Sequence, residues 1–309
     1  MSLSVAGVWC DAATWLWLGA GPDYTQAAPS RCIEPCCSLL IVCRCLVQTP
    51  AHWPATPVKV FGRPSLTGAG LFVALGARLV GPVGAAASGD GTHVFLADPG
   101  ASRIFAVPSS GGPPVAVAGS DGWAPRGLDV VTGSGRDTIY FSGRDPTDKA
   151  PGVFTLPAGG GTPAVVAKGA AFTSPDAVVV AATGGAVYVS DRGNGSAGTV
   201  LRVSSTVSTV LDSVRLGDPG GLSLSKDGRA LLVSSLDPVS GADQVLFVDL
   251  ASGKTGMAKN VIGANHNSSG GLHRARGATG MAWADTQGTV YRVRYPCRRA
   301  GSRSEPDPC

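Results

Sequence analysis

The chain has 309 residues, a formal net charge of +4 and only 15% charged residues, while its 44% hydrophobic content is enough to bury a sizeable core. Gly (44) and Pro (23) make up about a fifth of the chain, which suits many short strands joined by tight turns and argues against a helical protein. No basic stripe interleaved with aromatic residues is present, and this argues against nucleic-acid binding.

Residues 1–55 do not resemble the rest of the chain, because they show no sustained period of 2 or 3.6. A secretory signal is not convincing here, since no Lys or Arg precedes Arg31 and Asp11 interrupts the first apolar run. The second apolar run, residues 38–47, contains Arg44 and is too short to cross a bilayer, so we expect no transmembrane segment. We expect residues 1–55 to form a disordered or poorly packed leader.

The eight cysteines all lie outside the central part of the chain. None falls between residues 48 and 296, so the central part is expected to fold without disulfides. A zinc site in the leader is an alternative, although the spacing contains no C-x-x-C pair. The leader cysteines are Cys10, Cys32, Cys36, Cys37, Cys43 and Cys45, and the other two are Cys297 and Cys309.

Residues 174–214 show the pattern that organises the chain. Three β-rich runs, residues 177–181, 186–190 and 199–204, and a weaker fourth at 207–211 are separated by Gly, Asp, Asn or Ser. Short antiparallel strands are punctuated in this way. The same sequence pattern recurs at intervals of 43 to 59 residues. Four strands in a repeat of this length are typical of a β-propeller blade.

Four complete repeats begin with a Pro-x-Gly or Pro-x-Ala step, at Pro82, Pro125, Pro175 and Pro219. Their first two strands meet at turns such as Gly89-Asp90-Gly91 and Lys226-Asp227-Gly228, which are strong hairpin signals. The predicted third strands are residues 103–107, 152–156, 199–203 and 244–249.

The two ends of the repeat region are incomplete and complement each other. Residues 58–76 match residues 102–119 and are expected to supply the third and fourth strands of a unit, whereas MAWAD and TVYRVRY, after Ala278, are expected to supply the first and second. Pairing of these N-terminal and C-terminal strands would close the ring and leave no exposed sheet edge. The count predicts five blades over residues 56–296, with six as the alternative, residues 263–277 as a surface loop, and a disordered tail at 297–309.

Two kinds of polar residue are candidate site residues. Asp98 and Asp191 end the second strand of their repeats, so they could form part of an acidic ring for a divalent cation, or accept hydrogen bonds from backbone turns. Repetition at equivalent positions favours the structural role. Arg126 and Asp176 occupy the variable position of the Pro-x-Gly step, where loops of repeat scaffolds carry function. His273 lies in the predicted loop and is a further candidate.

The repeats resemble those of the NHL and TolB-like propeller superfamily. The resembling runs are SPDAVVVAATGGAVYVSDRG, GTVLRVSS and LPAGGGTPAVVAKG, within residues 58–295. The resemblance implies a β-propeller that binds a protein, a glycan or a small ligand through one face of the disc, and an extracytoplasmic or secreted location.

A related branch, the gluconolactonase-like enzymes, holds one divalent metal with Glu, Asn and Asp, and the closest match to its motif is PGGLSLSKDGRALLVSSLD. Gly220 stands where those enzymes have Asn, and Ser235 stands where they have Asp. Glu34 and Glu305 are the only glutamates of the sequence, so no Glu ligand lies within the repeats.

The sequence therefore favours a monomeric, non-catalytic binding propeller without a cofactor. The alternative is a hydrolase of the lactonase type that depends on a divalent cation such as Ca²⁺, with Asp98, Asp176 and Asp191 as its ligands.

Overall fold

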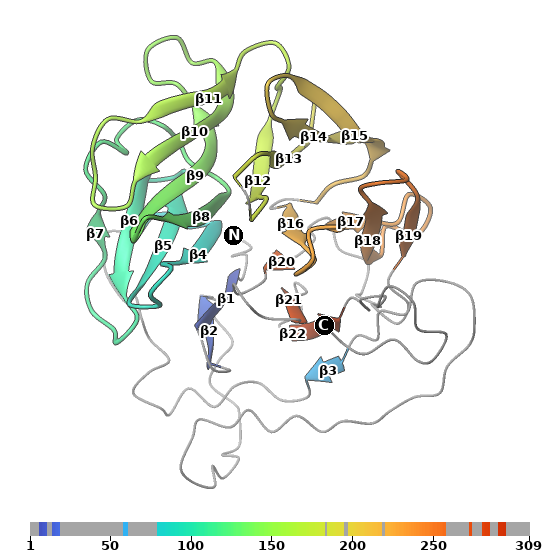
Figure 1. Cartoon of the computed structure of the whole chain (residues 1–309), viewed down its shortest axis with the longest axis horizontal. Coiled ribbons are helices and arrows are strands. Elements are labelled where there is room, and N and C mark those ends of the chain that lie inside the picture. The colour runs from blue at the N-terminus through green and yellow to red at the C-terminus, as the bar shows by residue number, and fades with distance from the viewer. Residues whose placement is uncertain are drawn as a thin grey trace, which may run out of the picture.

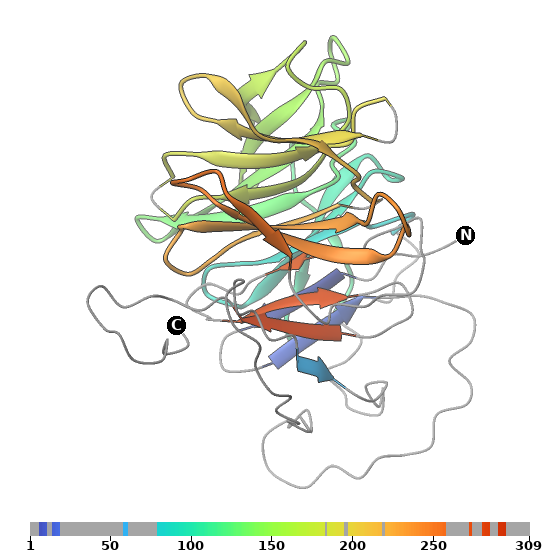
Figure 2. The same ribbon diagram turned by 90° about the vertical axis from the view of Figure 1, so that its right-hand side faces the viewer.

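The computed structural model describes residues 79–182, 184–194, 197–217 and 220–257, together with the backbone of six strands outside these ranges. Four-stranded antiparallel sheets stand around a common centre, as the blades of a propeller do (Figure 1). In the side view the sheets lie face to face (Figure 2). Among the described residues, no helix is long and apolar enough to cross a membrane.

Each of four blades consists of strands that follow one another in the chain and pair in that order. The innermost strands, β4, β8, β12 and β16, contact one another in turn around the centre (Figure 1). The third strands lie where the sequence predicts them. The first blade contains β4 (Gly84–Ala87), β5 (His93–Asp98), β6 (Arg103–Pro108) and β7 (Val115–Ala116), and the second contains β8 (Leu128–Gly133), β9 (Arg136–Arg144), β10 (Pro151–Pro157) and β11 (Ala164–Lys168). The third contains β12 (Pro175–Val180), β13 (Val187–Asp191), β14 (Gly198–Val203) and β15 (Val207–Val214), and the fourth contains β16 (Gly221–Leu224), β17 (Ala230–Leu236), β18 (Asp243–Asp249) and β19 (Thr255–Met257).

A further four-stranded sheet has the order β20-β21-β22-β3 and combines strands from distant parts of the chain. Strand β3 (Val58–Val60) pairs with β22 (Val290–Arg294), which is flanked by β21 (Gly280–Ala284). The runs MAWAD and TVYRVRY therefore form the second and third strands of this sheet, not the first and second as predicted. Its first strand, β20 (Leu272–His273), corrects the prediction that residues 263–277 contain no strand. The second strand predicted within residues 58–76 lies outside the described residues.

A hairpin of β1 (Ala6–Cys10) and β2 (Thr14–Leu18) lies within the segment expected to be disordered or poorly packed. Strand β1 contacts β4, β20 and β21. The structure thus shows four blades made of consecutive strands, rather than the predicted five or six. Closure of the ring by the mixed sheet remains a proposal.

Burial within a blade decreases from the inner strands to the outer ones. Every residue of β13, β16 and β17 is buried, whereas the outer strands β11 and β15 contain several exposed positions. Inner strands covered by neighbouring blades on both faces read as unbroken apolar runs, which explains the weak alternation of the sequence.

The turn between the first two strands has the same structure in the first and fourth blades. The hydroxyl of Ser88 donates to the carboxylate of Asp90 at 2.6 Å, and Ser225 donates to Asp227 at 2.6 Å. The following glycines have φ values of 71° (Gly91) and 68° (Gly228), in the left-handed region that favours glycine. The predicted Asp-Gly turns are confirmed at both places.

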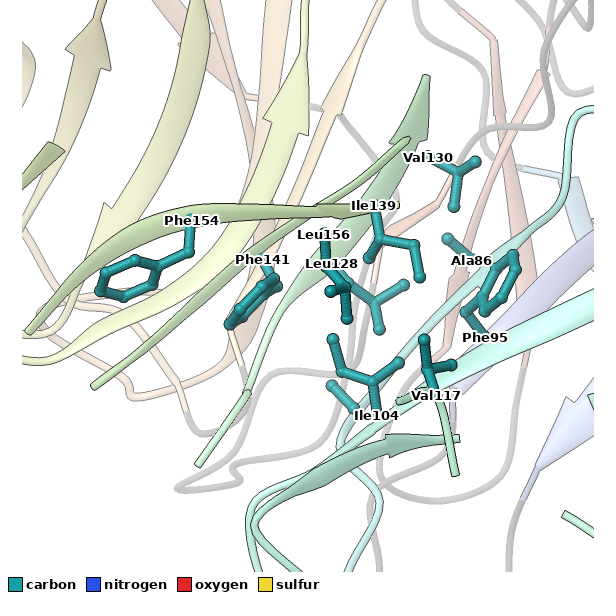
Figure 3. Close-up of a cluster of buried hydrophobic side chains, with 11 residues drawn as sticks. Ala86, Phe95, Ile104, Val117, Leu128, Val130, Ile139, Phe141, Phe154 and Leu156 are labelled. Carbon is teal, nitrogen blue, oxygen red and sulfur yellow. The ribbon is translucent and has the colours of Figure 1, made fainter. Parts of the chain in front are cut away.

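Apolar clusters fill the contacts between consecutive blades. Between the first and second blades, Phe141 and Phe154 belong to one buried cluster (Figure 3), with ring centroids 5.6 Å apart. The ring centroid of Trp123 lies 4.6 Å from that of Phe154. Similar clusters join the second blade to the third and the third to the fourth. These clusters hold neighbouring blades together and position the starts of their inner strands.

Candidate functional site

The starts of the inner strands approach one another backbone to backbone. A Cβ atom on Gly84 would overlap the carbonyl oxygen of Arg126, and a Cβ atom on Gly127 would overlap the carbonyl oxygen of Asp176. The glycine of the Pro-x-Gly step is therefore required by close contact with the next blade. We call the side of the disc on which these steps lie the proline face.

The chemistry of the variable residue in each step changes around the ring. This residue is Val83 in the first blade, Arg126 in the second, Asp176 in the third and Gly220 in the fourth. The Nε atom of Arg126 donates to Oδ1 of Asp176 at 2.9 Å, across the contact between the second and third blades. The structure thus brings together the two residues that the sequence analysis selected at the variable position of their steps.

Two further groups complete the site around Asp176. The backbone N–H of Gly220 donates to Oδ2 of Asp176 at 2.6 Å, and Nε of Arg192 lies 3.7 Å from the same oxygen. We call Arg126, Asp176 and Arg192 the arginine–aspartate cluster. Sequence analysis did not select Arg192, and its position directly after Asp191, at the end of β13, was the available signal.

The carboxylate of the cluster is more deeply buried than the two arginine side chains around it. The side chain of Asp176 is 2% exposed, while those of Arg126 and Arg192 are 24% and 25% exposed. Burial raises the pKa of Asp176, because the charged form loses its hydration, and the charge of Arg126 and the N–H of Gly220 oppose this effect. The carboxylate is thus buried, while part of each arginine side chain is exposed to solvent.

Serine side chains hold the backbone beneath the cluster. The hydroxyl of Ser142 donates to the carbonyl oxygen of Asp176 and accepts the backbone N–H of Gly127 at 3.0 Å. Ser190, at the equivalent place in the third blade, accepts the N–H of Ala177 at 2.9 Å. The geometry of the cluster is fixed by these contacts between strands and between blades.

Asp98 and Asp191 make matching sets of hydrogen bonds to the backbone. The carboxylate of Asp98 accepts the N–H groups of Val80, Gly81 and Ala101 at 2.7, 3.0 and 2.9 Å. The carboxylate of Asp191 accepts those of Thr173, Ser174 and Gly193 at 2.7, 2.8 and 2.9 Å. Each therefore fixes the loop that leads into its own inner strand, as well as the turn that follows it. Within the part of the chain that the structure describes, no group of three or more His, Cys, Asp or Glu residues is placed to hold a metal ion.

Two other positions relate to the predicted site. His273 lies on β20, opposite Ala282 of β21, and its side chain is outside the described part of the chain. Ser235 follows Ser234 on β17, as Asp191 follows Ser190 on β13, and its side chain is fully buried. The Ser235 hydroxyl has no hydrogen-bond partner among the described residues.

Comparison with known proteins supports the fold and leaves the function open. No protein-family profile matches the chain, and no curated protein matches it in sequence. Among solved structures, the chain is similar to a nidogen/laminin complex, with 14% identity, 66% of this chain and 72% of that chain covered, and a TM-score of 0.51. It is also similar to a gluconolactonase from Xanthomonas campestris, with 16% identity, coverages of 70% and 72%, and a TM-score of 0.52. A third similar structure is a TolB-type protein from Agrobacterium tumefaciens, with 17% identity, coverages of 68% and 73%, and a TM-score of 0.44.

Proposed function

We propose that this β-propeller is a non-catalytic binding protein that recognises a protein, a glycan or a small ligand through its proline face. The observation that carries the proposal is the arginine–aspartate cluster, in which a buried carboxylate holds two arginines whose side chains are about a quarter exposed at that face. Loops and strand ends on one face of a propeller are where such scaffolds present binding groups.

The cluster is not required for the steps to pack. The first and fourth blades have Val83 and Gly220 at the same position, and their inner strands still contact their neighbours. Burying an ion pair costs desolvation free energy that apolar packing does not cost, so an ion pair is a poor choice for stability alone. A charged cluster at two successive steps is better explained by recognition of something outside the chain.

The metal-dependent alternative fits the donor arrangement poorly. The carboxylates of Asp98 and Asp191 already accept three backbone N–H groups each, and Asp176 accepts from Arg126 and Gly220. A divalent cation would have to displace these donors, and at Asp176 it would also face the positive charge of two arginines. The arrangement suits hydrogen-bonded recognition better than cation coordination.

The first experiment separates these two functions with the full chain. Metal content is measured on the purified protein, and its thermal melting is followed with added Ca²⁺ and with EDTA. We expect no stoichiometric metal and a melting temperature that EDTA leaves unchanged. One tightly held ion, with a large melting shift on chelation, would instead support the hydrolase, and lactone hydrolysis would then be assayed.

The second experiment tests the proline face directly. A thermal-shift screen of sugars, metabolites and glycans is run on the unaltered protein, on Arg192→Gln and on Arg136→Gln. Arg136 is an exposed arginine at the opposite end of the inner hairpin of the second blade, so it is a matched control. A ligand whose shift is lost only in Arg192→Gln supports the proposal. The proposal fails if every ligand found acts equally on all three proteins.

We also propose that the mixed sheet β20-β21-β22-β3 closes the ring of blades within residues 56–296, flanked by a leader at 1–55 and a tail at 297–309. Pairing of β3 with β22 supports this, and the contacts of β1 with β4 and β20 suggest that the leader hairpin fills the remaining gap. Removal of residues 1–57 tests the hairpin, and removal of residues 1–61 also tests β3. A melting temperature unchanged by both deletions would contradict this closure.

We further propose that the protein is a monomer and acts outside the cytoplasm. The resemblance to secreted propellers supports the location, and multi-angle light scattering tests the monomer. A stable dimer in solution would refute the monomer, and retention of a tagged full-length chain in the cytoplasm of its own host would refute the location.

A further inference from the structure

We propose that the proline face binds an anionic group, a carboxylate or a phosphate, at the arginines around residues 173–176. This inference rests on the proposed function and adds the chemical class of the ligand. It is argued from the placement of charge at the cluster and at one neighbouring arginine, Arg144.

Three arginine side chains contact the same short segment, from the start of the inner strand and the end of the second strand of the second blade and from the end of the second strand of the third. Nε of Arg126 donates to Asp176 at 2.9 Å, and Nε of Arg192 lies 3.7 Å from the same carboxylate. Nη2 of Arg144 donates to the carbonyl oxygen of Thr173 at 3.4 Å. Three cationic side chains from two blades thus converge on residues 173–176.

The charges form two layers with opposite signs. The two carboxylates next to Arg126 and Arg192, those of Asp176 and Asp191, are buried, and Asp191 directs both of its oxygens to backbone N–H groups. In the loop that follows Arg144, Asp145 and Asp148 are both paired with Lys168. The arginines reach solvent, since Arg144 is exposed and about a quarter of the Arg126 and Arg192 side chains is exposed. An approaching ligand would therefore meet positive charge, with the negative charge behind it.

Guanidinium groups held in this way suit carboxylate and phosphate oxygens. The planar group offers a fork of N–H donors that matches these anions, and charge-assisted hydrogen bonds of this kind are the strong ones. The contacts of Arg126 to Asp176 and of Arg144 to Thr173 already restrict their rotamers. Less conformational entropy is then lost when a ligand binds, which favours affinity.

The experiment compares four probes at equal ionic strength: inorganic phosphate, D-glucuronate, neutral D-glucose, and chloride as the reference. Binding is measured by thermal shift and by calorimetry on the full chain, on Arg192→Gln and Arg144→Gln, and on the control Arg136→Gln. These variants keep the buried pair of Arg126 and Asp176, and Arg144 is exposed, so at least one altered protein is expected to fold.

We expect phosphate or glucuronate to bind and each site variant to weaken this binding roughly tenfold, because one charge-assisted hydrogen bond is lost. Arg136→Gln should bind like the unaltered protein. Phosphate binding alone would assign a phosphorylated ligand, and glucuronate binding alone would assign a carboxylate ligand.

Other outcomes overturn the inference. Equal anion binding by all variants would show a non-specific ionic effect. Binding of glucose or another neutral ligand that depends on Arg192, without anion binding, would refute the anion class and leave the proposed function standing. If neither the anions nor any ligand of the wider screen binds through this face, both proposals fail.

Discussion

The contacts between the first and second blades and between the second and third share one backbone arrangement but carry different chemistry. In both, a glycine at the start of one inner strand lies against the carbonyl oxygen of the next step, Gly84 against Arg126 and Gly127 against Asp176. In both, apolar side chains fill the middle of the contact. The residue preceding the glycine differs, because Val83 leaves the first step uncharged while Arg126 joins the second contact to a buried carboxylate. The repeat therefore fixes how blades pack, and single variable positions within it introduce binding groups.

The largest effect on stability is expected from the apolar cluster between the first and second blades. Phe154 is fully buried between the first and second blades, next to Trp123 and Phe141. Phe154→Ala should lower the free energy of unfolding by about 3–5 kcal/mol, through lost burial and the cavity left behind. Urea denaturation measures this, with Phe154→Leu as a milder control. A loss below about 1 kcal/mol would show that the contact between the two blades is not tightly packed.

The ion pair between the second and third blades is tested by removing Arg126, the partner of the buried Asp176 carboxylate. Arg126→Met should cost about 3 kcal/mol at pH 7, because it leaves the Asp176 charge buried with weaker compensation. The variant also raises the pKa of Asp176 further, so the loss should shrink as the pH falls and the carboxyl becomes protonated. Adding Asp176→Asn should restore most of the stability. A loss that is the same at pH 4 and pH 7 would contradict the role of this ion pair.

The close approach of the backbones at one end of β8 predicts that substitutions of Gly127 and Gly133, at its two ends, change stability by different amounts. Gly127→Ala places a methyl group against the carbonyl of Asp176 and should cost about 1–3 kcal/mol. Gly133→Ala, at the other end of β8, has no atom within 4 Å of the added Cβ and should change stability by less than about 0.5 kcal/mol. Chemical denaturation of both variants checks this. Equal effects would mean that the inner strands are farther apart than the structure shows.

Asp98 and Asp191 should respond alike, because their hydrogen bonds match. Asn at either position keeps one carbonyl oxygen and loses acceptor capacity, so each change should cost about 1–2 kcal/mol. Thermal and urea unfolding of Asp98→Asn and Asp191→Asn measure this. A much larger loss of ligand binding in one of them, at equal stability, would assign that residue to the site.

The smallest change concerns the pH dependence at Asp176. A raised folded-state pKa means that the folded protein holds a proton that the unfolded chain releases, so stability falls as the pH rises from about 4 toward the folded-state pKa. Asp176→Asn cannot ionise, so its stability relative to the unaltered protein should rise over the same range. Other carboxyls, such as Asp90 with a pKa of about 2, contribute equally to both proteins and cancel. A difference that stays constant from pH 4 to pH 7 would show that the Asp176 pKa is not raised.

Local sequence predicted most of the blade architecture because its signals act over few residues. Apolar runs and Asp-Gly turns located the strands, with bounds near those of β13 and β14, and the left-handed φ of Gly91 and Gly228 agrees with the predicted turns. The blade count was less accurate. It depends on whether strands from the two ends of the repeat region form a blade together, and pairing between such distant segments leaves no local periodic pattern.

The sequence by itself determined the repeat, the four-stranded unit and the special positions of its Pro-x-Gly step. Those features follow from backbone conformation and burial, which a single repeat specifies locally. Only the tertiary structure decided that Arg126 meets Asp176, 50 residues away, that Arg192 completes the cluster, and that Asp98 and Asp191 bind their own loops. Contacts between blades depend on how whole sheets pack around the ring. The local sequence pattern of one repeat does not indicate which side chains this packing brings together.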